Sequence, residues 1–486
     1  MLAVLNRFHT FISRISRGVG FIRSVALVAG GTALSQGVVL LISPILSRLY
    51  TPEDFGILGV YTSLFSLLTA VTSLCYEQAI PLPKKDKDAA NLLALSLMLV
   101  LVMSFFTGFL FLLGGERVAL WANTPILGRY LWLLPLSMLG AAGYQSLSYW
   151  MARKQRFAAI SYTKLVRSLG LVGMQATLGV WRLGPIGLIV GHVVGQFSGV
   201  IPLLKGFRLS RDEIVPQKWP ALARTYKNFP LFAVWTSLIN AIGIKALPLL
   251  FAKYFTLDTA GFFSQTMRVL GLPVTLIGQS VAQVFYPKAA RNEEESGSAK
   301  RLVEQVATSL FILSFLSFSF VALHGADLFA WILGDSWRVS GVYAQYLAPC
   351  FMISFVSSPL SSFALVKGKQ KDTFIYGLLL TGSRLGAIGL GNWYDSPNLA
   401  VISFSAVNVL FYLLYIGWIL RLAGSSLLAC LSRIKVFVLG GVLLFIGLFS
   451  LKPLLAPLAS LIISVGSLGL FGLWFGLKDR RGTVGE

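Results

Sequence analysis

Five basic side chains lie inside long apolar runs of this sequence, where a charge is costly. They are Arg167, Lys245, Arg268 and Arg384, with Lys164 nearer to the end of its run. A charged side chain at the centre of a bilayer costs about 2.5–3.5 kcal/mol, so such residues usually have a function. All five are cations, and a guanidinium binds phosphate oxygens through paired hydrogen bonds and stays charged. These residues therefore predict a site for an anion within a membrane.

Uncharged polar residues accompany these cations at helical spacing. Gln265 and Gln279 lie three residues before and eleven residues after Arg268, on one face of a helix. Gln196 and Asn408 lie 212 residues apart and place an amide in each of two other apolar runs. Such a face cannot point at lipid without a large free-energy penalty, so it lines water or another helix. We predict that the five cations and these four amides bind the substrate.

Two further ionisable residues, Glu77 and Arg48, complete the candidate set. Lys164 and Arg167 have a second interpretation, in which their charged groups extend to the membrane boundary and have no role in binding. Glu77 is the one acid near a membrane face; it is predicted to couple transport to H⁺ or Na⁺, with a structural ion pair as the favoured alternative. Arg48 is predicted to take part in coupling or gating. His192 has no ligand or base nearby in sequence and is expected to be packed or hydrogen-bonded.

The composition indicates that lipid is the solvent for most of the chain. Of its 486 residues, 56% are hydrophobic and 12% are charged, and the mean hydropathy is +0.75. A helix needs about 20 apolar residues to cross the hydrocarbon. Fourteen runs of this kind predict an all-α polytopic membrane protein. They cover residues 25–47, 55–76, 90–113, 127–150, 159–181, 184–204, 229–252, 260–286, 302–323, 343–366, 373–391, 398–420, 434–451 and 454–477.

The net charge of +22 follows the membrane topology and does not indicate nucleic-acid binding. With the N-terminus inside, the inside segments hold 29 Lys and Arg residues and the outside loops hold seven. Because cytoplasmic loops are the basic ones, both termini are predicted to be cytoplasmic. Residues 1–24 place apolar side chains on one helical face. This predicts an amphipathic helix on the lipids of the cytoplasmic leaflet, with a disordered basic arm as the alternative.

Two stretches of sequence reveal an internal repeat. LSRLYTPEDFG (residues 46–56) matches FAKYFTLDTAG (residues 251–261) at an offset of 205, and Pro135 matches Pro349 at an offset of 214. Six spans per unit give parallel repeats, and transporters built in this way bind substrate between halves that rock. The predicted organisation is two six-helix lobes around a central cavity plus two extra helices. Its segments are residues 25–204 (first lobe), 205–228 (connecting loop), 229–420 (second lobe) and 421–486 (spans 13 and 14 and a cytoplasmic tail).

The motifs RLY-x-PEDFG (from Arg48) and YE-x-AI-x-LP followed by NLL (from Tyr76) carry a resemblance to a known family. The chain resembles the polysaccharide transporters, which include the O-antigen and capsule-repeat flippases of the multidrug/oligosaccharidyl-lipid/polysaccharide exporter superfamily. The resemblance implies a multi-pass protein of the bacterial cytoplasmic (inner) membrane. It implies that the substrate is a polyprenyl-diphosphate-linked oligosaccharide. It also implies a polysaccharide polymerase and a chain-length regulator as partners.

Two other classes of protein are weighed against this interpretation. A membrane-embedded glycosyltransferase or polysaccharide polymerase needs a catalytic base or metal carboxylates on a sizeable loop, and the outside loops are short. A multidrug exporter of cations needs carboxylates deep in its helices, where this chain has cations. The three cysteines lie far apart and no nucleotide-binding motif is found. We therefore predict no catalytic residue, no metal site and no cofactor.

Overall fold

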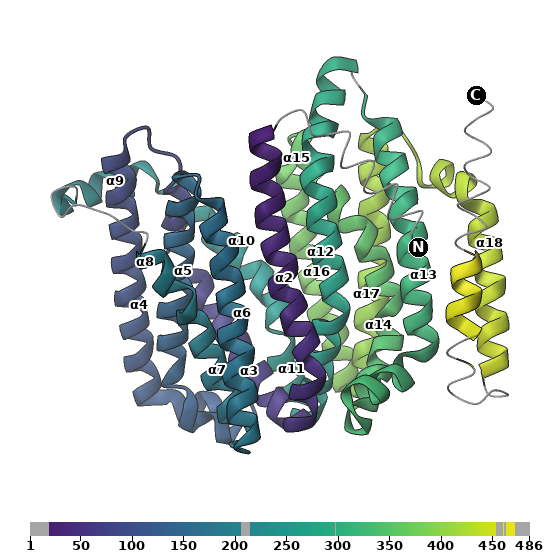
Figure 1. The fold of residues 1–486 in the computed structure, drawn as a ribbon, viewed down its shortest axis with the longest axis horizontal. Coiled ribbons are helices and arrows are strands. Elements are labelled where there is room, and N and C mark those ends of the chain that lie inside the picture. The colour runs from purple at the N-terminus through teal and green to yellow at the C-terminus, as the bar shows by residue number, and fades with distance from the viewer. Residues whose placement is uncertain (1–18, 206–213, 297, 453–459, 461–462, 472–486) are drawn as a thin grey trace. The chain divides into compact units, whose positions relative to one another are not determined.

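The computed structural model describes residues 19–205, 214–296, 298–452, 460 and 463–471, which form helices and no β-strand (Figure 1). The chain divides into two compact units. The first unit comprises residues 26–265 and 376–400, and the second comprises residues 1–25, 266–375 and 401–486. The helices α2, α12, α16 and α17 each contribute residues to both units.

The first unit is built around a group of long helices, α3 to α7, which pack side by side (Figure 1). Glycines on α7 allow α6 to approach it closely, and α5 contacts both helices. The elements of this unit are α2 (Val19–Leu49), α3 (Pro52–Thr72), η1 (Tyr76–Ala79), α4 (Asp86–Trp121), η2 (Pro125–Tyr130), α5 (Leu133–Arg153), α6 (Phe157–Val180), α7 (Pro185–Ser198), α8 (Val200–Lys205), η4 (Pro216–Lys218), α9 (Trp219–Thr225), η5 (Phe229–Ala233), α10 (Val234–Asn240), η6 (Ala241–Lys245), α11 (Leu247–Tyr254), the start of α12 (Leu257–Ser296) and most of α16 (Gln370–Trp393).

The second unit is centred on the pair α13 and α14, which approach closely at Gly325 and Gly341. A Cβ atom on either glycine would clash with the backbone of the other, so neither position has room for a side chain. Helix α18 packs against α13 through Phe315 and Phe437. The elements of this unit are the rest of α12, α13 (Lys300–Leu333), η7 (Asp335–Trp337), α14 (Arg338–Leu360), α15 (Ser362–Val366), most of α17 (Pro397–Leu422) and α18 (Leu427–Leu451).

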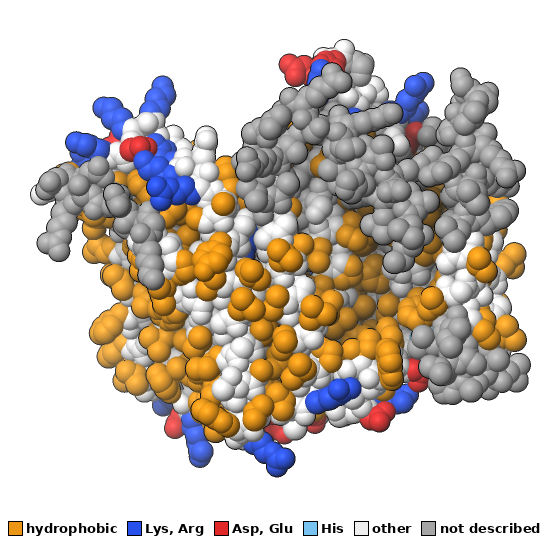
Figure 2. Space-filling model, viewed as in Figure 1, with side chains coloured by type: hydrophobic (Ala, Val, Ile, Leu, Met, Phe, Trp, Pro, Cys, Tyr) orange, Lys and Arg blue, Asp and Glu red, His pale blue; other side chains and the backbone are white. Residues whose placement is uncertain are grey.

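The outward faces of the helices are apolar, as expected of a chain surrounded by lipid. On α4, Phe105, Phe106, Leu112 and Leu113 are all more than half exposed. Figure 2 shows hydrophobic side chains along the middle of the helices, with Lys, Arg, Asp and Glu near the helix ends. An aqueous protein could not expose so much apolar surface without aggregating. The chain is therefore a multi-pass membrane protein.

The number of membrane spans is only partly established by the helices. Ten described helices are long and apolar enough to cross a membrane, or eleven if the bent pair Phe229–Lys245 and Leu247–Tyr254 forms one span. Helices α5 and α6 occupy two further predicted spans but are less apolar, because they carry polar residues of the site described below. The count of fourteen remains a prediction. Most of the fourteenth run and of the helix expected at 1–24 lies outside the described residues, as do residues 206–213 of the connecting loop.

The span expected at 229–252 is broken into four short pieces. It contains π-helical turns at Phe229–Ala233 and Ala241–Lys245, and it bends by 49° before α11. Pro248 follows this bend in the first turn of α11. Because proline has no N–H group and its ring crowds the carbonyl four residues earlier, it favours a bend at this position. Pro248 thus directly follows the bend of the broken span.

Candidate functional site

The first unit contains a cavity of about 690 Å³ that lies among α2, α3, α5, α6 and α7. Two cations, Lys164 and Arg167, line it, and none of the described residues that line it is acidic. The cavity therefore has a positive charge and suits an anionic ligand. Its walls combine aromatic, amide and hydroxyl groups with apolar side chains: Val28, Phe65, Thr69, Ala141, Tyr144, Gln145, Ser148, Tyr149, Ala152, Ile160, Lys164, Arg167 and Gln196.

Arg167 is held in place by contacts on two sides of its guanidinium. The carbon at the centre of the guanidinium lies 4.2 Å from the centre of the Tyr144 ring, in a cation–π contact. One nitrogen donates a hydrogen bond to the side-chain carbonyl of Gln196. The Gln196 amide is 3.2 Å from a ring nitrogen of His192, so three side chains form a connected set. None of these partners is an acid, which leaves the positive charge of Arg167 available to a ligand.

Glycines on α7 make room for this arrangement. Gly187, Gly191, Gly195 and Gly199 recur every four residues and face α6. A Cβ atom on Gly195 would lie 2.6 Å from that of Leu171, and one on Gly199 would lie 2.7 Å from Cδ of Arg167. Small residues at this spacing let two helices pack closely in a membrane. They place the Gln196 amide next to a cation on the neighbouring helix.

Lys164 lies one turn away from Arg167 on α6. Its ammonium donates a 2.8 Å hydrogen bond to the Thr32 hydroxyl on α2. The side chain lines the cavity and is half-buried. Lys164 is therefore hydrogen-bonded to a neighbouring helix, and its role in binding stays a prediction.

Glu77 lies behind the cavity wall in η1. Its carboxylate is 3% exposed and accepts hydrogen bonds from the Ser73 hydroxyl and, at 3.2 Å, from the Gln145 amide. Gln145 itself lines the cavity. Both donors are neutral, so within the described residues the structure shows no ion pair for Glu77. The carboxyl is thus buried one side chain away from the two cations.

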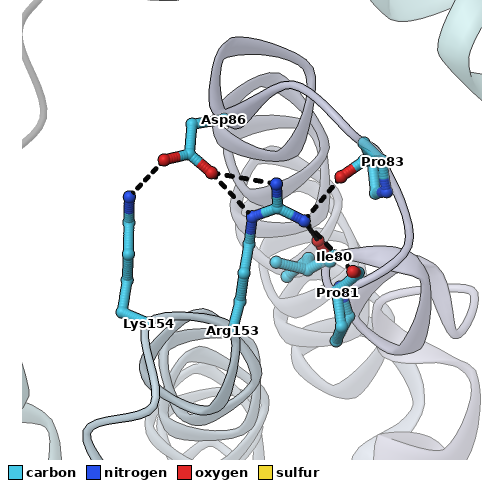
Figure 3. Close-up of polar contacts among 6 residues, drawn as sticks. All are labelled: Ile80, Pro81, Pro83, Asp86, Arg153 and Lys154. Atoms are coloured by element: carbon cyan, nitrogen blue, oxygen red, sulfur yellow. Dashed lines mark hydrogen bonds and ion pairs between the residues drawn. The ribbon is translucent and has the colours of Figure 1, made fainter.

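An arginine fixes the loop that follows Glu77 (Figure 3). Arg153, at the end of α5, donates hydrogen bonds to the carbonyls of Pro83 at 2.7 Å and Pro81 at 3.1 Å. It also donates to Asp86 at the start of α4, and Lys154 pairs with the other oxygen of Asp86 at 2.6 Å. The Arg153 side chain is only 12% exposed, so these bonds hold the loop firmly against α5. This explains the composition of the motif from Tyr76, whose prolines leave carbonyls free to accept these bonds.

Arg384 and Lys245 belong to the same unit but do not line the cavity. Arg384 is buried on α16 and donates a 3.1 Å hydrogen bond to the carbonyl of Gly243, which lies in a π-helical turn. This contact links α16 to the broken span. Lys245 lies two residues further on and its side chain is exposed. The structure therefore separates these two cations from Lys164 and Arg167.

The remaining predicted residues lie elsewhere. Gln265 is buried in the first unit, and its amide donates a 2.8 Å hydrogen bond to the Ser43 hydroxyl. Arg268 is half-buried, Gln279 is exposed, and Asn408 is buried and bonded to the Phe404 carbonyl of its own helix; all three belong to the second unit. Arg48 is exposed at the end of α2.

Tyr144 and Gln145, which contact Arg167 and Glu77 respectively, are not among the residues predicted from the sequence. A signal for them existed in the fourth apolar run. Ser137, Tyr144, Gln145 and Ser148 recur at helical spacing there and form a polar face. His192 is hydrogen-bonded to Gln196 and packs edge-on against Phe65, with ring centres 4.9 Å apart, which confirms the expectation of a packed histidine. No group of His, Cys, Asp and Glu in the described residues could hold a metal ion.

Comparisons with known proteins agree with a transport role. A family model described as polysaccharide biosynthesis protein matches residues 45–341. The succinoglycan biosynthesis transport protein ExoT of Rhizobium meliloti (strain 1021) is 24% identical over 427 residues, which cover 83% of this chain and 81% of ExoT. The lipopolysaccharide biosynthesis protein WzxC of Escherichia coli (strain K12) is 21% identical over 401 residues, which cover 81% of this chain and 80% of WzxC.

Solved structures show the same fold. The lipid II flippase MurJ in an inward closed conformation matches with a TM-score of 0.75 at 10% identity, covering 94% of this chain and 99% of MurJ. An inward-facing multidrug resistance MATE family transporter of the MOP superfamily matches with a TM-score of 0.60 at 13% identity. That match covers 80% of this chain and 94% of the transporter.

Proposed function

Because the chain belongs to the polysaccharide biosynthesis protein family and has the fold of MOP superfamily transporters, we propose that it is a flippase for a polyprenyl-diphosphate-linked oligosaccharide. It is a membrane transporter and not an enzyme, like the transport proteins that it resembles. The substrate would be a repeat unit of O-antigen, capsule or exopolysaccharide. Alternating access would carry it from the cytoplasmic leaflet to the outer leaflet of the bacterial inner membrane.

The observation that supports this proposal best is the cationic cavity. A diphosphate carries negative charge, and Arg167 and Lys164 present positive charge with no acid among the lining residues. Gln145, Gln196 and Ser148 add amide and hydroxyl groups that suit the hydroxyls of a sugar. The same walls would repel the cationic compounds that a multidrug exporter carries.

The membrane potential favours the proposed direction of transport. Moving a negative headgroup outward across an inside-negative membrane is favoured by about 2.3 kcal/mol per charge per 100 mV. The empty cavity must then return to face the cytoplasm before the next cycle. We propose that this return step uses a coupling ion, either H⁺ or Na⁺, and that Glu77 binds it.

We expect that Glu77→Gln removes the dependence of transport on the coupling ion. Burial raises the pKa of the Glu77 carboxyl, so it takes up a proton more readily than an exposed acid. Cys75 and Tyr149 are the nearby titratable groups. Glutamine keeps a side-chain carbonyl as acceptor but cannot titrate. Flipping in proteoliposomes would be measured under an imposed H⁺ or Na⁺ gradient. If Glu77→Gln responds to the gradient as the native chain does, the residue has no coupling role. Flipping by the native chain at its full rate without any gradient would likewise contradict coupling.

The function itself is tested by complementation and by direct assay. The gene is expected to restore surface polysaccharide in a strain that lacks its own flippase. Purified protein in proteoliposomes is expected to move a fluorescent polyprenyl-diphosphate oligosaccharide between leaflets. Formation of a glycosidic bond by the purified protein would instead support the glycosyltransferase or polymerase alternative. We also propose that a polysaccharide polymerase and a chain-length regulator act with it, which co-purification from the native host would test.

A further inference from the structure

The two copies of the internal repeat begin their helices at equivalent residues. Helix α3 starts at Pro52 and α12 starts at Leu257, which are 205 residues apart, the offset of the repeated motif. A threonine precedes each start and caps it. The Thr51 hydroxyl accepts a hydrogen bond from the backbone N–H of Asp54 at 3.2 Å, and the Thr256 hydroxyl accepts one from Thr259 at 3.1 Å. The repeat in sequence is thus a repeat in local structure.

These two helices contact each other through residues that the repeat makes equivalent. A Cβ atom on Gly56 would overlap the carbonyl oxygen of Leu257, and one on Gly261 would overlap the carbonyl oxygen of Pro52. The contact is therefore reciprocal. When residue i contacts j' and residue j contacts i', the two parts are related by a two-fold rotation. A pseudo-two-fold axis consequently passes between the first turns of α3 and α12.

The next turn of each helix continues the same pattern. Gly59 and Ser264 are also 205 residues apart, and a Cβ atom on Gly59 would lie 2.7 Å from the Ser264 hydroxyl oxygen and 3.6 Å from its Cβ. Equivalent residues can touch each other only where they lie on the axis. The backbones of the two repeats are therefore in direct contact over two turns.

A second contact joins the repeats at this end of the unit. The Lys253 ammonium lies 3.7 Å from the centre of the Trp121 ring, which belongs to the end of α4. The Asn123 amide donates a 3.4 Å hydrogen bond to the Ala252 carbonyl. The excess of basic residues in the opposite loops predicts that this end faces the outside. The two halves of the repeat are thus closed against each other at the predicted outer end.

We propose that the glycine crossing of α3 and α12 is the outer closure of the transport path, which must separate each time the cavity opens outward. This inference rests on the proposed function, because a flippase that alternates access has to close one end while the other is open. At the crossing itself the contact runs through glycine and backbone atoms, so no interlocked side chain has to be withdrawn when the helices part. Glycine at both positions makes the closure tight and still reversible.

A disulfide across the axis tests the proposal. In a full-length chain with Cys75, Cys350 and Cys430 replaced by serine, Gly59→Cys and Ser264→Cys would place two Cβ atoms about as far apart as in natural disulfides. We expect oxidation to cross-link this variant and to reduce flipping in proteoliposomes at least tenfold, and a reductant to restore it. A cross-linked protein that flips at the rate of the reduced protein would overturn the proposal, and so would failure of the cysteines to cross-link.

A matched control pair lies within one repeat. Ser96 on α4 and Ser146 on α5 have hydroxyl oxygens 2.9 Å apart, and both residues belong to the first half of the chain. A disulfide between cysteines at these positions joins helices that would move together. We expect oxidation of this pair to leave flipping within about twofold of the reduced rate.

Labelling of the cavity separates failure of the closure from failure of the proposed substrate. A cysteine at Ser148, which lines the cavity, is expected to lose labelling by a membrane-impermeant maleimide from outside when the disulfide forms, and to keep labelling from inside. Gly261→Ala is expected to act in the opposite direction by wedging the helices apart and increasing outside labelling. Gly389→Ala, where a Cβ atom meets nothing within 4 Å, is the control. If the cross-linked Gly59→Cys, Ser264→Cys protein is labelled from outside as strongly as the reduced protein, the closure proposal is wrong. If labelling changes as expected but the reduced protein does not flip the oligosaccharide, the proposed substrate is wrong and the closure stands.

Discussion

Replacing Arg167 with alanine is expected to reduce flipping of a polyprenyl-diphosphate oligosaccharide about 100-fold. The guanidinium is the group in the cavity that can bind diphosphate oxygens through paired hydrogen bonds, and hydrogen bonds to charged groups contribute about 1.5–3 kcal/mol each. Tyr144 and Gln196 hold it without neutralising it, so its charge acts on the ligand. Initial rates in proteoliposomes, corrected for the amount of reconstituted protein, would measure the loss.

Two further variants distinguish binding from folding. Arg167→Lys keeps the positive charge but loses the paired hydrogen bonds of the guanidinium. Its flipping rate should lie between those of the native chain and Arg167→Ala. Arg182→Ala removes an exposed arginine just beyond the other end of α6 and should leave the rate unchanged. Near-native flipping by Arg167→Ala, with normal surface polysaccharide in cells, would exclude this residue from the substrate site.

Replacing Gly199 with alanine is expected to lower flipping about tenfold without removing any charge. The new methyl group would lie 2.7 Å from Cδ of Arg167 and 2.9 Å from the Tyr144 ring, so the arginine has to leave its position. The backbone of Gly199 has a φ of −81°, which any residue adopts, so the change acts through the side-chain contact alone. Valine at this position should have a larger effect, because it adds two more methyl groups.

The matched control for Gly199 lies on the partner helix. Gly173 on α6 has nothing within 4 Å of the position of a Cβ atom, and Gly173→Ala should leave flipping and melting temperature unchanged. If Gly199→Ala slows flipping while its melting temperature in detergent stays near that of the native chain, the position of the guanidinium matters as well as its charge. A native rate for Gly199→Ala would show that the ligand does not depend on the observed placement of Arg167.

The sequence predicted the long helices well, because a chain in lipid must satisfy its backbone hydrogen bonds within each helix and must carry long apolar runs. The bend before Pro248 could not be predicted from the proline alone, because α12 and α14 continue through Pro273 and Pro349. Helix ends were less predictable: α4 runs from Asp86 to Trp121, well beyond the run at 90–113. Charged and polar residues continue a helix past the hydrocarbon, where no hydropathy signal marks its end.

The sequence by itself determined that the chain lies in a membrane, that the charges deepest in its apolar runs are cationic, and that it contains a repeat. Residue types and their spacing along one chain carry all three facts. Only the tertiary structure decided which of the predicted cations share a cavity: Lys164 and Arg167 do, whereas Arg384 bonds to a backbone carbonyl. It also decided that Tyr144 and Gln196 hold Arg167, and that Gly56 and Gly261 cross at an axis. These contacts depend on how close neighbouring helices approach, and that distance is set by glycines whose partners lie far away in sequence.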